Sequence, residues 1–245
     1  MKYRVSVSEM PIKLPGGTIY GKGFMPEGKD GKLTSMILSH GYNSSYNAVI
    51  DLASALAEIG VFTYCYDFRG GSVFSKSSGS SLDMSIKSEI NDLKQVIFYV
   101  SNLKNIDRNK IFLYGESQGG FVAALTADEN IRGLYLLYPA FCIPDDWKDV
   151  TIRDRKNFMG MPLSGRFCEG LPDYDVFEHI RSYNGAVKIY HGDSDAIVPL
   201  SYSEKIVRCF KNAGLRVFEG EGHGFSPKAR NELLEIICDD FLYIS

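Results

Sequence analysis

The stretch that decides the fold is residues 110–127, Lys-Ile-Phe-Leu-Tyr-Gly-Glu-Ser-Gln-Gly-Gly-Phe-Val-Ala-Ala-Leu-Thr-Ala. Its apolar run from Ile111 to Tyr114 is typical of a buried strand, and the small and apolar residues from Gly119 onward are typical of a helix packed on a sheet. Between them lies a G-x-S-x-G pattern, residues 115–119, which is a sharp strand-to-helix turn that presents a serine above the sheet.

This turn predicts a nucleophile at Ser117. Side chains at Gly115 and Gly119 would collide with the neighbouring strand and helix, and the turn holds the serine in a strained conformation. Because the bare pattern also arises by chance as a Gly-Ser turn without chemistry, the prediction depends on the strand-turn-helix context.

The segments around the turn alternate between strands and helices. Residues 2–25 predict an antiparallel hairpin that turns at 15–17. Further strands are expected at 33–38, 61–66, 111–114, 132–138, 186–190 and 215–219, and helices at 46–59, 83–103, from 119 onward, at 201–212 and at 227–243. This alternation favours an α/β fold with a mostly parallel sheet covered by helices on both faces.

Residues 140–183 interrupt the alternation. They hold the only tryptophan, many charges and two Pro-containing turns, with weak periodicity. We therefore expect a core formed by 1–139 and 184–245, with 140–183 inserted as a cap or lid over a site at the ends of the strands. The alternative is an insertion that is only a surface excursion.

The composition limits the function classes. In 245 residues the net charge is −3 and no apolar run approaches the roughly 20 residues that span a bilayer, so we expect neither nucleic acid nor membrane as a partner. The first residues lack the apolar stretch of a signal peptide, although the sequence does not exclude a leader that has been removed. Five scattered cysteines without C-x-x-C spacing are typical of reduced thiols in a cytoplasmic protein.

A serine nucleophile needs a base, and in proteins with this turn the partners follow in the order serine, acid, histidine. Of the four histidines, His223 lies in the Gly-rich stretch 220–225 just before the last helix and is the expected base. His191 precedes the expected acid and is interpreted as structural, and His40 as a buried, hydrogen-bonded residue.

The acid should lie on the loop after the strand at 186–190. Asp193 and Asp195 both qualify by position. The pattern His-Gly-x-x-Asp-x-x-Val-Pro over 191–199 favours Asp195, while Asp193 is expected to stabilise the turn through its own side-chain-to-backbone hydrogen bonds.

The oxyanion of a tetrahedral intermediate needs preorganised donors. One is the backbone N–H of Gln118, the residue after the nucleophile. The loop after the strand at 33–38 should supply the other, which we assign to the backbone N–H of Tyr42.

Four separated motifs now carry a resemblance: His-Gly-Tyr at 40–42, Gly-Glu-Ser-Gln-Gly-Gly at 115–120, His-Gly-Asp-Ser-Asp at 191–195 and Gly-His-Gly at 222–224. Along nearly its whole length the chain resembles an α/β-hydrolase. The Ser-Gln-Gly-Gly sequence and an insertion of this length after the sixth core strand are similar to the cinnamoyl or feruloyl esterase subgroup. The chain differs from that subgroup at Glu116, where a histidine is common, and at 69–72, where Arg-Gly-Gly-Ser replaces Arg-Gly-His-Gly.

The resemblance implies a small-molecule ester substrate and no metal or organic cofactor. It also makes four residues of the insertion candidates to line an acyl pocket: Asp145, Asp146, Trp147 and Tyr174. An aromatic acid would stack on rings while a polar group contacts its ring hydroxyls. Each of these residues could instead only pack or solvate the cap, and the oligomeric state, including a homodimer, stays open.

The leading hypothesis is a serine carboxylesterase that works through an acyl-enzyme. The alternatives are a peptidase of the acylaminoacyl or prolyl oligopeptidase type, a monoacylglycerol or lysophospholipid hydrolase, and a non-catalytic ligand binder on the same fold.

Overall fold

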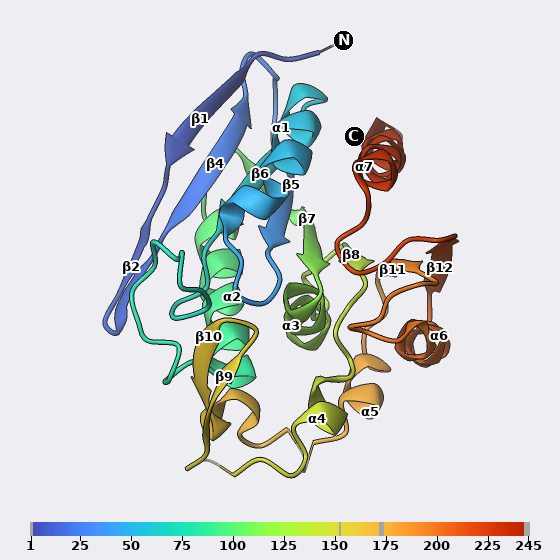
Figure 1. The fold of residues 1–245 in the computed structure, drawn as a ribbon. Helices are drawn as coiled ribbons and strands as arrows, with labels where there is room; N and C mark the ends of the chain where they lie inside the picture. The colour runs from blue at the N-terminus through green and yellow to red at the C-terminus, as the bar shows by residue number, and fades with distance from the viewer. Residues whose placement is uncertain (1, 152, 172–173, 243–245) are drawn as a thin grey trace.

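An eight-stranded sheet runs through the molecule in the order β1-β4-β6-β5-β7-β8-β11-β12 (Figure 1). The computed structural model describes residues 2–151, 153–171 and 174–242. The strands of this sheet are β1 (Val5–Glu9), β4 (Gly21–Pro26), β5 (Leu33–Ser39), β6 (Phe62–Tyr66), β7 (Ile106–Glu116), β8 (Gly133–Leu137), β11 (Ala186–Gly192) and β12 (Ala213–Phe218). From β6 to β12 all neighbours are parallel, whereas β1 and β4 are antiparallel.

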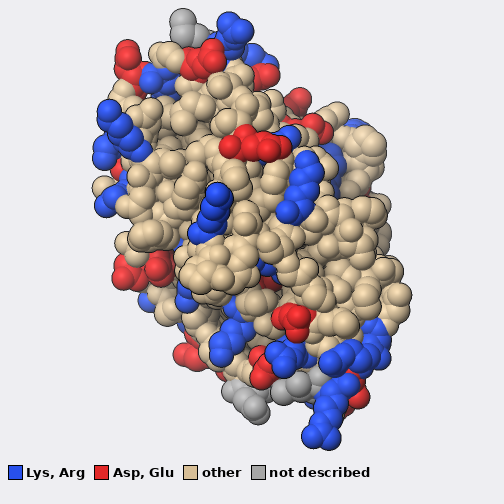
Figure 2. All heavy atoms as spheres, turned by 90° about the vertical axis from the view of Figure 1, so that its left-hand side faces the viewer, with Lys and Arg blue, Asp and Glu red and all other residues tan. Residues whose placement is uncertain are grey.

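The expected hairpin at the start of the chain is present as two antiparallel pairs. β1 pairs with β4, and the short strands β2 (Ile12–Leu14) and β3 (Gly17–Ile19) pair between them. This pairing adds the antiparallel edge to an otherwise parallel sheet. Figure 2 shows the face of the molecule on this side, where acidic and basic side chains are interspersed around a broad uncharged area.

Helices cover both faces of the sheet (Figure 1). On one face lie α1 (Ile50–Glu58), preceded by the 3-10 turn η1 (Tyr46–Val49), and α7 (Pro227–Leu242). On the other lie α2 (Ile86–Ser101), α3 (Gln118–Thr126) and α6 (Leu200–Cys209). Strands β5, β6 and β8 are buried at every residue, because both of their faces are covered. The α/β-hydrolase architecture predicted from the sequence is confirmed.

Local sequence explains where the helices begin and end. α1 stops at Gly60, whose φ of +95° is a left-handed conformation that glycine adopts without strain. α2 begins at a capping box formed by Ser85 and Ser88, which satisfies free N–H groups of its first turn. The expected end of the last helix at Tyr243 lies outside the described residues.

The insertion leaves the sheet after β8, the sixth strand of this sheet in chain order. It contains α4 (Ile143–Asp146), an antiparallel hairpin of β9 (Arg155–Phe158) and β10 (Met161–Ser164), the 3-10 turn η2 (Gly165–Cys168) and α5 (Val176–Ile180). The weak periodicity did not predict this hairpin. Buried side chains such as Trp147, Leu163 and Phe167 join the main core cluster, which argues against a purely surface excursion. The division into core and cap as separate units stays a prediction.

All five cysteines are free, and all but Cys238 are buried. None of the helices in the described ranges has the length and apolar character to cross a bilayer.

Candidate active site

Ser117 lies at the junction of β7 and α3 with φ of 51° and ψ of −118°. This is the strained turn expected from the sequence, and the two glycines explain why it can form. A Cβ on Gly115 would overlap the backbone of Gly119 at the start of α3, and a Cβ on Gly119 would overlap the carbonyl oxygens of Ser39 and His40 at the end of β5. The expected collisions are therefore present on both sides of the serine.

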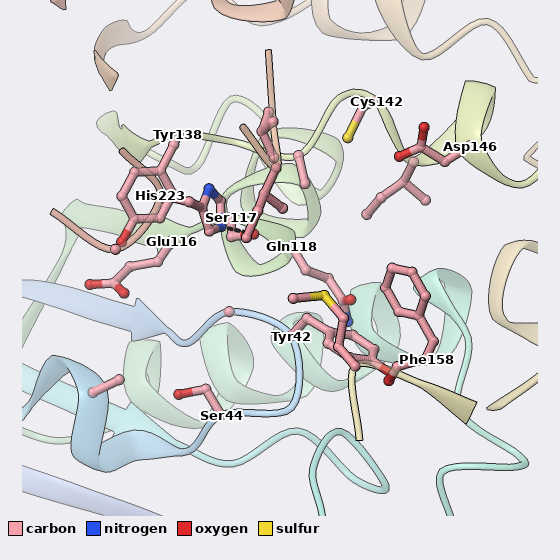
Figure 3. Close-up of a pocket in the computed structure, with 18 of the residues that line it drawn as sticks. Tyr42, Ser44, Glu116, Ser117, Gln118, Tyr138, Cys142, Asp146, Phe158 and His223 are labelled. Atoms are coloured by element: carbon pink, nitrogen blue, oxygen red, sulfur yellow. Dashed lines mark hydrogen bonds between the residues drawn. The ribbon is translucent and has the colours of Figure 1, made fainter. Parts of the chain in front are cut away.

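The structure brings Ser117, His223 and Asp195 together in one chain of hydrogen bonds (Figure 3). Ser117 Oγ lies 3.0 Å from His223 Nε2, and His223 Nδ1 lies 2.7 Å from Asp195 Oδ2. Asp195 lies on the loop between β11 and α6, and His223 on the loop between β12 and α7. All three thus lie at the carboxyl ends of parallel strands.

Asp195 is held as a carboxylate. Burial by itself would raise its pKa, but hydrogen bonds from His191, from His223 and from the backbone N–H groups of Val198 and Ile197 outweigh burial and hold the pKa well below its usual range. An ionised carboxylate only accepts, so His223 carries its proton on Nδ1. Its Nε2 is then free to accept the proton of Ser117.

His191 is more closely connected to this site than the sequence indicated. Ser203 donates to its Nδ1 at 2.7 Å, so its Nε2–H donates to the Val198 carbonyl at 2.9 Å and lies 3.3 Å from Asp195 Oδ2. Nothing in the sequence indicated this contact with the acid. Asp193 accepts from the Gly220 N–H at 2.7 Å, so it ties two loops together instead of bonding only within its own turn.

His40 is buried, as the sequence indicated. Its Nε2 accepts from the Phe68 N–H at 3.3 Å, which leaves Nδ1–H to donate to the Gly41 carbonyl at 2.7 Å. Burial lowers its pKa, which favours the neutral imidazole.

The two residues expected to supply the oxyanion donors, Tyr42 and Gln118, line the same cavity as the serine. Gln118 is the first residue of α3, where backbone N–H groups have no partner within the helix. Gly41, next to Tyr42, passes so close that a Cβ there would lie 3.3 Å from the Cβ of Ser117. Among the hydrogen bonds found for the described residues, none uses the N–H of Tyr42 or of Gln118.

Gln118, whose backbone N–H is one of the two expected oxyanion donors, is held by a buried carboxyl group. The Gln118 side chain donates to Glu89 Oε2 at 2.6 Å, and Glu89, on α2, is 1% exposed. The pKa of Glu89 is raised to about 8, chiefly by burial; the hydrogen bond from Gln118 opposes this increase and the charge of the nearby Asp92 adds to it. Helical periodicity placed Glu89 on α2, but nothing local indicated that it faces the serine turn.

A cavity of about 320 Å³ opens above Ser117. On one side of the serine lies Phe158 of the insertion, which forms an aromatic wall with Trp147 and Phe167, because the Trp147 ring contacts both phenyl rings (Figure 3). On the other side lie His223, Tyr138 and Glu116, as Figure 3 shows. The insertion therefore forms part of the cavity.

Of the four expected pocket residues, the structure brings Asp146 and Trp147 to the cavity. Burial and the neighbouring Asp146 raise the pKa of the Cys142 thiol in the same wall to about 12. Asp145 instead accepts a hydrogen bond from Tyr202 at 2.7 Å, and Tyr174 is exposed against His179, so neither lines the cavity. Within the described part of the chain, no cluster of three or more His, Cys, Asp or Glu residues could hold a metal.

Comparison with known proteins agrees with this geometry. The family model Hydrolase_4, described as serine aminopeptidase S33, matches residues 32–171. The structure of Est1E from Butyrivibrio proteoclasticus with ferulic acid bound superposes with a TM-score of 0.86 and 25% identity, covering 96% of this chain and 98% of that chain. The predicted resemblance to α/β-hydrolase serine esterases of the feruloyl group is thereby confirmed.

Two further relatives are more distant. A monoacylglycerol lipase from Paleococcus ferrophilus has a TM-score of 0.69 and 16% identity over 99% of this chain and all of that one, which shows the common fold. An uncharacterized protein of Mycobacterium tuberculosis is 22% identical over 199 residues, covering 81% of this chain and 66% of the relative. The chain thus spans about two thirds of the length of the curated relatives it matches.

Proposed function

The chain belongs to the Hydrolase_4 family, described as serine aminopeptidase S33, and from this premise we propose that it is a serine carboxylesterase acting on esters of hydroxycinnamic acids. The observation that carries the proposal is the hydrogen-bonded series Ser117, His223 and Asp195 at the base of a cavity with an aromatic wall. The ferulic acid bound to Est1E, a protein with the same fold over nearly the whole chain, supports the acyl class.

The proposed reaction uses an acyl-enzyme. Ser117 attacks the ester carbonyl carbon while His223 Nε2 takes its proton, and the oxyanion that forms accepts from the Tyr42 and Gln118 N–H groups. The tetrahedral intermediate collapses, its C–O bond to the alcohol breaks, and His223 returns the proton to the leaving oxygen. Water then attacks the acyl-enzyme with His223 again as base, and the acid is released.

The two sides of the cavity would bind the two parts of the ester. A planar cinnamoyl ring would pack against Trp147, Phe158 and Phe167, whose ring edges and faces suit aromatic contacts. The Asp146 carboxylate on the same side would accept a hydrogen bond from a ring hydroxyl. The alcohol would leave toward His223.

A second candidate is an aminopeptidase, favoured by the description of the family model. The Asp146 carboxylate in the cavity wall could then pair with the free amino group of a peptide. The same Ser117 chemistry would cleave an amide in place of an ester.

A panel of substrates tests these proposals. We expect methyl ferulate and chlorogenate to be hydrolysed with kcat/KM at least about tenfold above that of p-nitrophenyl acetate, because only their acyl groups carry a ring that contacts the aromatic wall. Ser117→Ala should lower turnover by about 10³-fold or more while the protein stays folded. Ser44→Ala, at a cavity residue outside the hydrogen-bonded series, is the matched control and should retain activity.

Other outcomes would redirect the assignment. Turnover of the acetate alone would keep the esterase and remove the hydroxycinnamate class. Turnover of an aminoacyl p-nitroanilide alone would favour the aminopeptidase, and a preference for a long-chain p-nitrophenyl ester would favour a lipase. If none of the substrates is turned over in a way that depends on Ser117, the hypothesis of a non-catalytic ligand binder would be favoured.

A further inference from the structure

One guanidinium connects the segments that carry Ser117 and His223. Arg230, from α7, binds both carboxylate oxygens of Glu116, with Nη1 2.5 Å from Oε1 and Nη2 3.2 Å from Oε2. The same side chain donates to the Tyr138 hydroxyl at 2.6 Å and to the Gly224 carbonyl at 3.2 Å. Two planar groups paired in this way have a fixed mutual orientation.

Each partner of Arg230 adjoins a residue of the proposed reaction. Glu116 directly precedes Ser117, and Gly224 directly follows His223. The Tyr138 ring lies against the His223 ring, with centroids 4.3 Å apart. The Arg230 hydrogen bonds therefore restrain the nucleophile turn, the histidine loop and the ring that packs on the imidazole.

The pair also balances charge inside the cavity. Glu116 and Arg230 both line it, and their side chains are 7% and 32% exposed. Burial by itself would lower the pKa of Arg230, but the hydrogen bonds and charge of Glu116 raise it, so the guanidinium stays charged beside a carboxylate. Since opposite charges cancel at a distance, the intact pair exerts only a small net field on His223, which must become an imidazolium during the reaction.

We propose that Arg230 and Glu116 act together as positioning residues. The pair holds the His223 imidazole in hydrogen-bonding position toward Ser117, and it keeps the net charge near the imidazole small. The proposal rests on the proposed function for its kinetic test. It assigns a role to the residue at which the chain departs from the histidine common in the feruloyl subgroup.

Other charged and titratable groups surround these residues. Asp195 binds the far side of His223, and Tyr114 donates to Glu116 at 2.8 Å. His40 lies behind the serine turn, Asp146 faces the cavity from the insertion, and Glu221 binds Ser226 at the start of α7. The variants below leave all of these groups unchanged.

The charge balance predicts a signed shift in the pH profile. Glu116→Gln leaves the Arg230 charge uncompensated, which disfavours the imidazolium, so the acid limb of kcat/KM should move to lower pH by about half to one unit. The double variant Glu116→Gln/Arg230→Met has neither charge, and its acid limb should return to the wild-type position. An unmoved limb in the single variant, or an equal shift in the double variant, would overturn the proposal.

The positioning role is tested by Arg230→Lys, which keeps the charge and loses the paired geometry. We expect kcat to fall about tenfold to a hundredfold, KM to change little and the acid limb to stay in place. Wild-type kcat in this variant would contradict the role. The matched control is Arg216→Met/Glu232→Gln, which removes an exposed ion pair of the same kind between β12 and α7, the helix that carries Arg230, and should change neither quantity.

A readout without substrate separates this proposal from the esterase assignment. The His223 ring protons, assigned by comparison with His223→Ala, can be titrated by nuclear magnetic resonance. The Glu116→Gln shift to lower pH should appear there even if no ester is hydrolysed, in which case only the proposed function would fail. A His223 titration that is the same in wild type and Glu116→Gln would overturn the charge balance itself.

Discussion

At the scale of single residues, strained backbone conformations and buried polar groups are concentrated around the cavity above Ser117. The non-glycine residues with positive φ in the described chain are Asn43, Ser117, Tyr138, Met159 and Phe225. Three of them line the cavity and the other two lie beside cavity residues. Such conformations cost about 1–3 kcal/mol each and persist only where surrounding contacts enforce them. Their concentration at the cavity indicates that the local geometry serves the site and not the stability of the chain.

Glu89 gives a prediction at this scale. Its pKa is raised from 4.5 to about 8, mainly by burial, so the folded chain keeps a proton that the unfolded chain has lost. The free energy of unfolding should therefore fall as the pH rises from about 4.5 to about 8, with about 1.4 kcal/mol for each pKa unit of difference. Asp195 has a depressed pKa, so its effect on the free energy of unfolding changes at lower pH, outside this window.

Urea denaturation at several pH values measures the effect. Glu89→Gln keeps the shape and an acceptor for Gln118 but cannot ionise, so its stability should depend less on pH between about 5 and 8. Equal slopes for the two proteins would show that Glu89 titrates near its ordinary value.

At the scale of elements, the serine turn depends on the close approach of β5, β7 and α3. Gly119→Ala should lower the free energy of unfolding by about 1–3 kcal/mol, because a Cβ there overlaps two carbonyl oxygens at the end of β5. Any relief of that overlap moves the loop that bears Tyr42, so we also expect kcat to fall about a hundredfold.

Thermal unfolding and kinetics measured on one preparation check both effects. Gly214→Ala in β12 is the control, because a Cβ there meets nothing within 4 Å. A Gly119→Ala protein as stable and active as the Gly214→Ala protein would contradict the steric account.

At the scale of the whole molecule, the insertion and the sheet meet through the loop that follows β5. Tyr42 donates to the Phe158 carbonyl at 2.8 Å, and Asn43 donates to the Met159 carbonyl at 3.2 Å. The Tyr42 ring also packs edge-on against Phe158 and Phe167. The residue expected to supply an oxyanion N–H therefore also anchors the aromatic wall.

Tyr42→Phe removes that anchor and leaves the backbone N–H in place. We expect KM for methyl ferulate to rise about threefold to tenfold, the size of one lost hydrogen bond, while KM for p-nitrophenyl acetate stays unchanged. Tyr64→Phe removes a tyrosine bond to the Met10 carbonyl far from the cavity and is the matched control. An equal effect on both esters would show that the hairpin of β9 and β10 does not contact the acyl group.

Much of the fold was predictable because its signals are local. Apolar runs marked the buried strands, and Gly60 marked the end of α1 through its left-handed conformation. The structure also brings Ser117, Asp195 and His223 together, while their catalytic roles stay a prediction. Asp145 and Asp146 show the limit: they are adjacent in sequence, but helical rotation turns one toward Tyr202 and the other toward the cavity.

Outside the insertion, the sequence by itself determined the order of the main strands and helices, the serine turn and the loops that carry its partners, because each of these depends on residues close together in the chain. Only the tertiary structure decided which side chains support them. Glu89 meets Gln118 across 29 residues, and Arg230 meets Glu116 across 114. A polar group that is buried between packed elements needs a hydrogen-bond partner. Sequence periodicity shows which residues are buried, but it does not show which distant residue will be that partner.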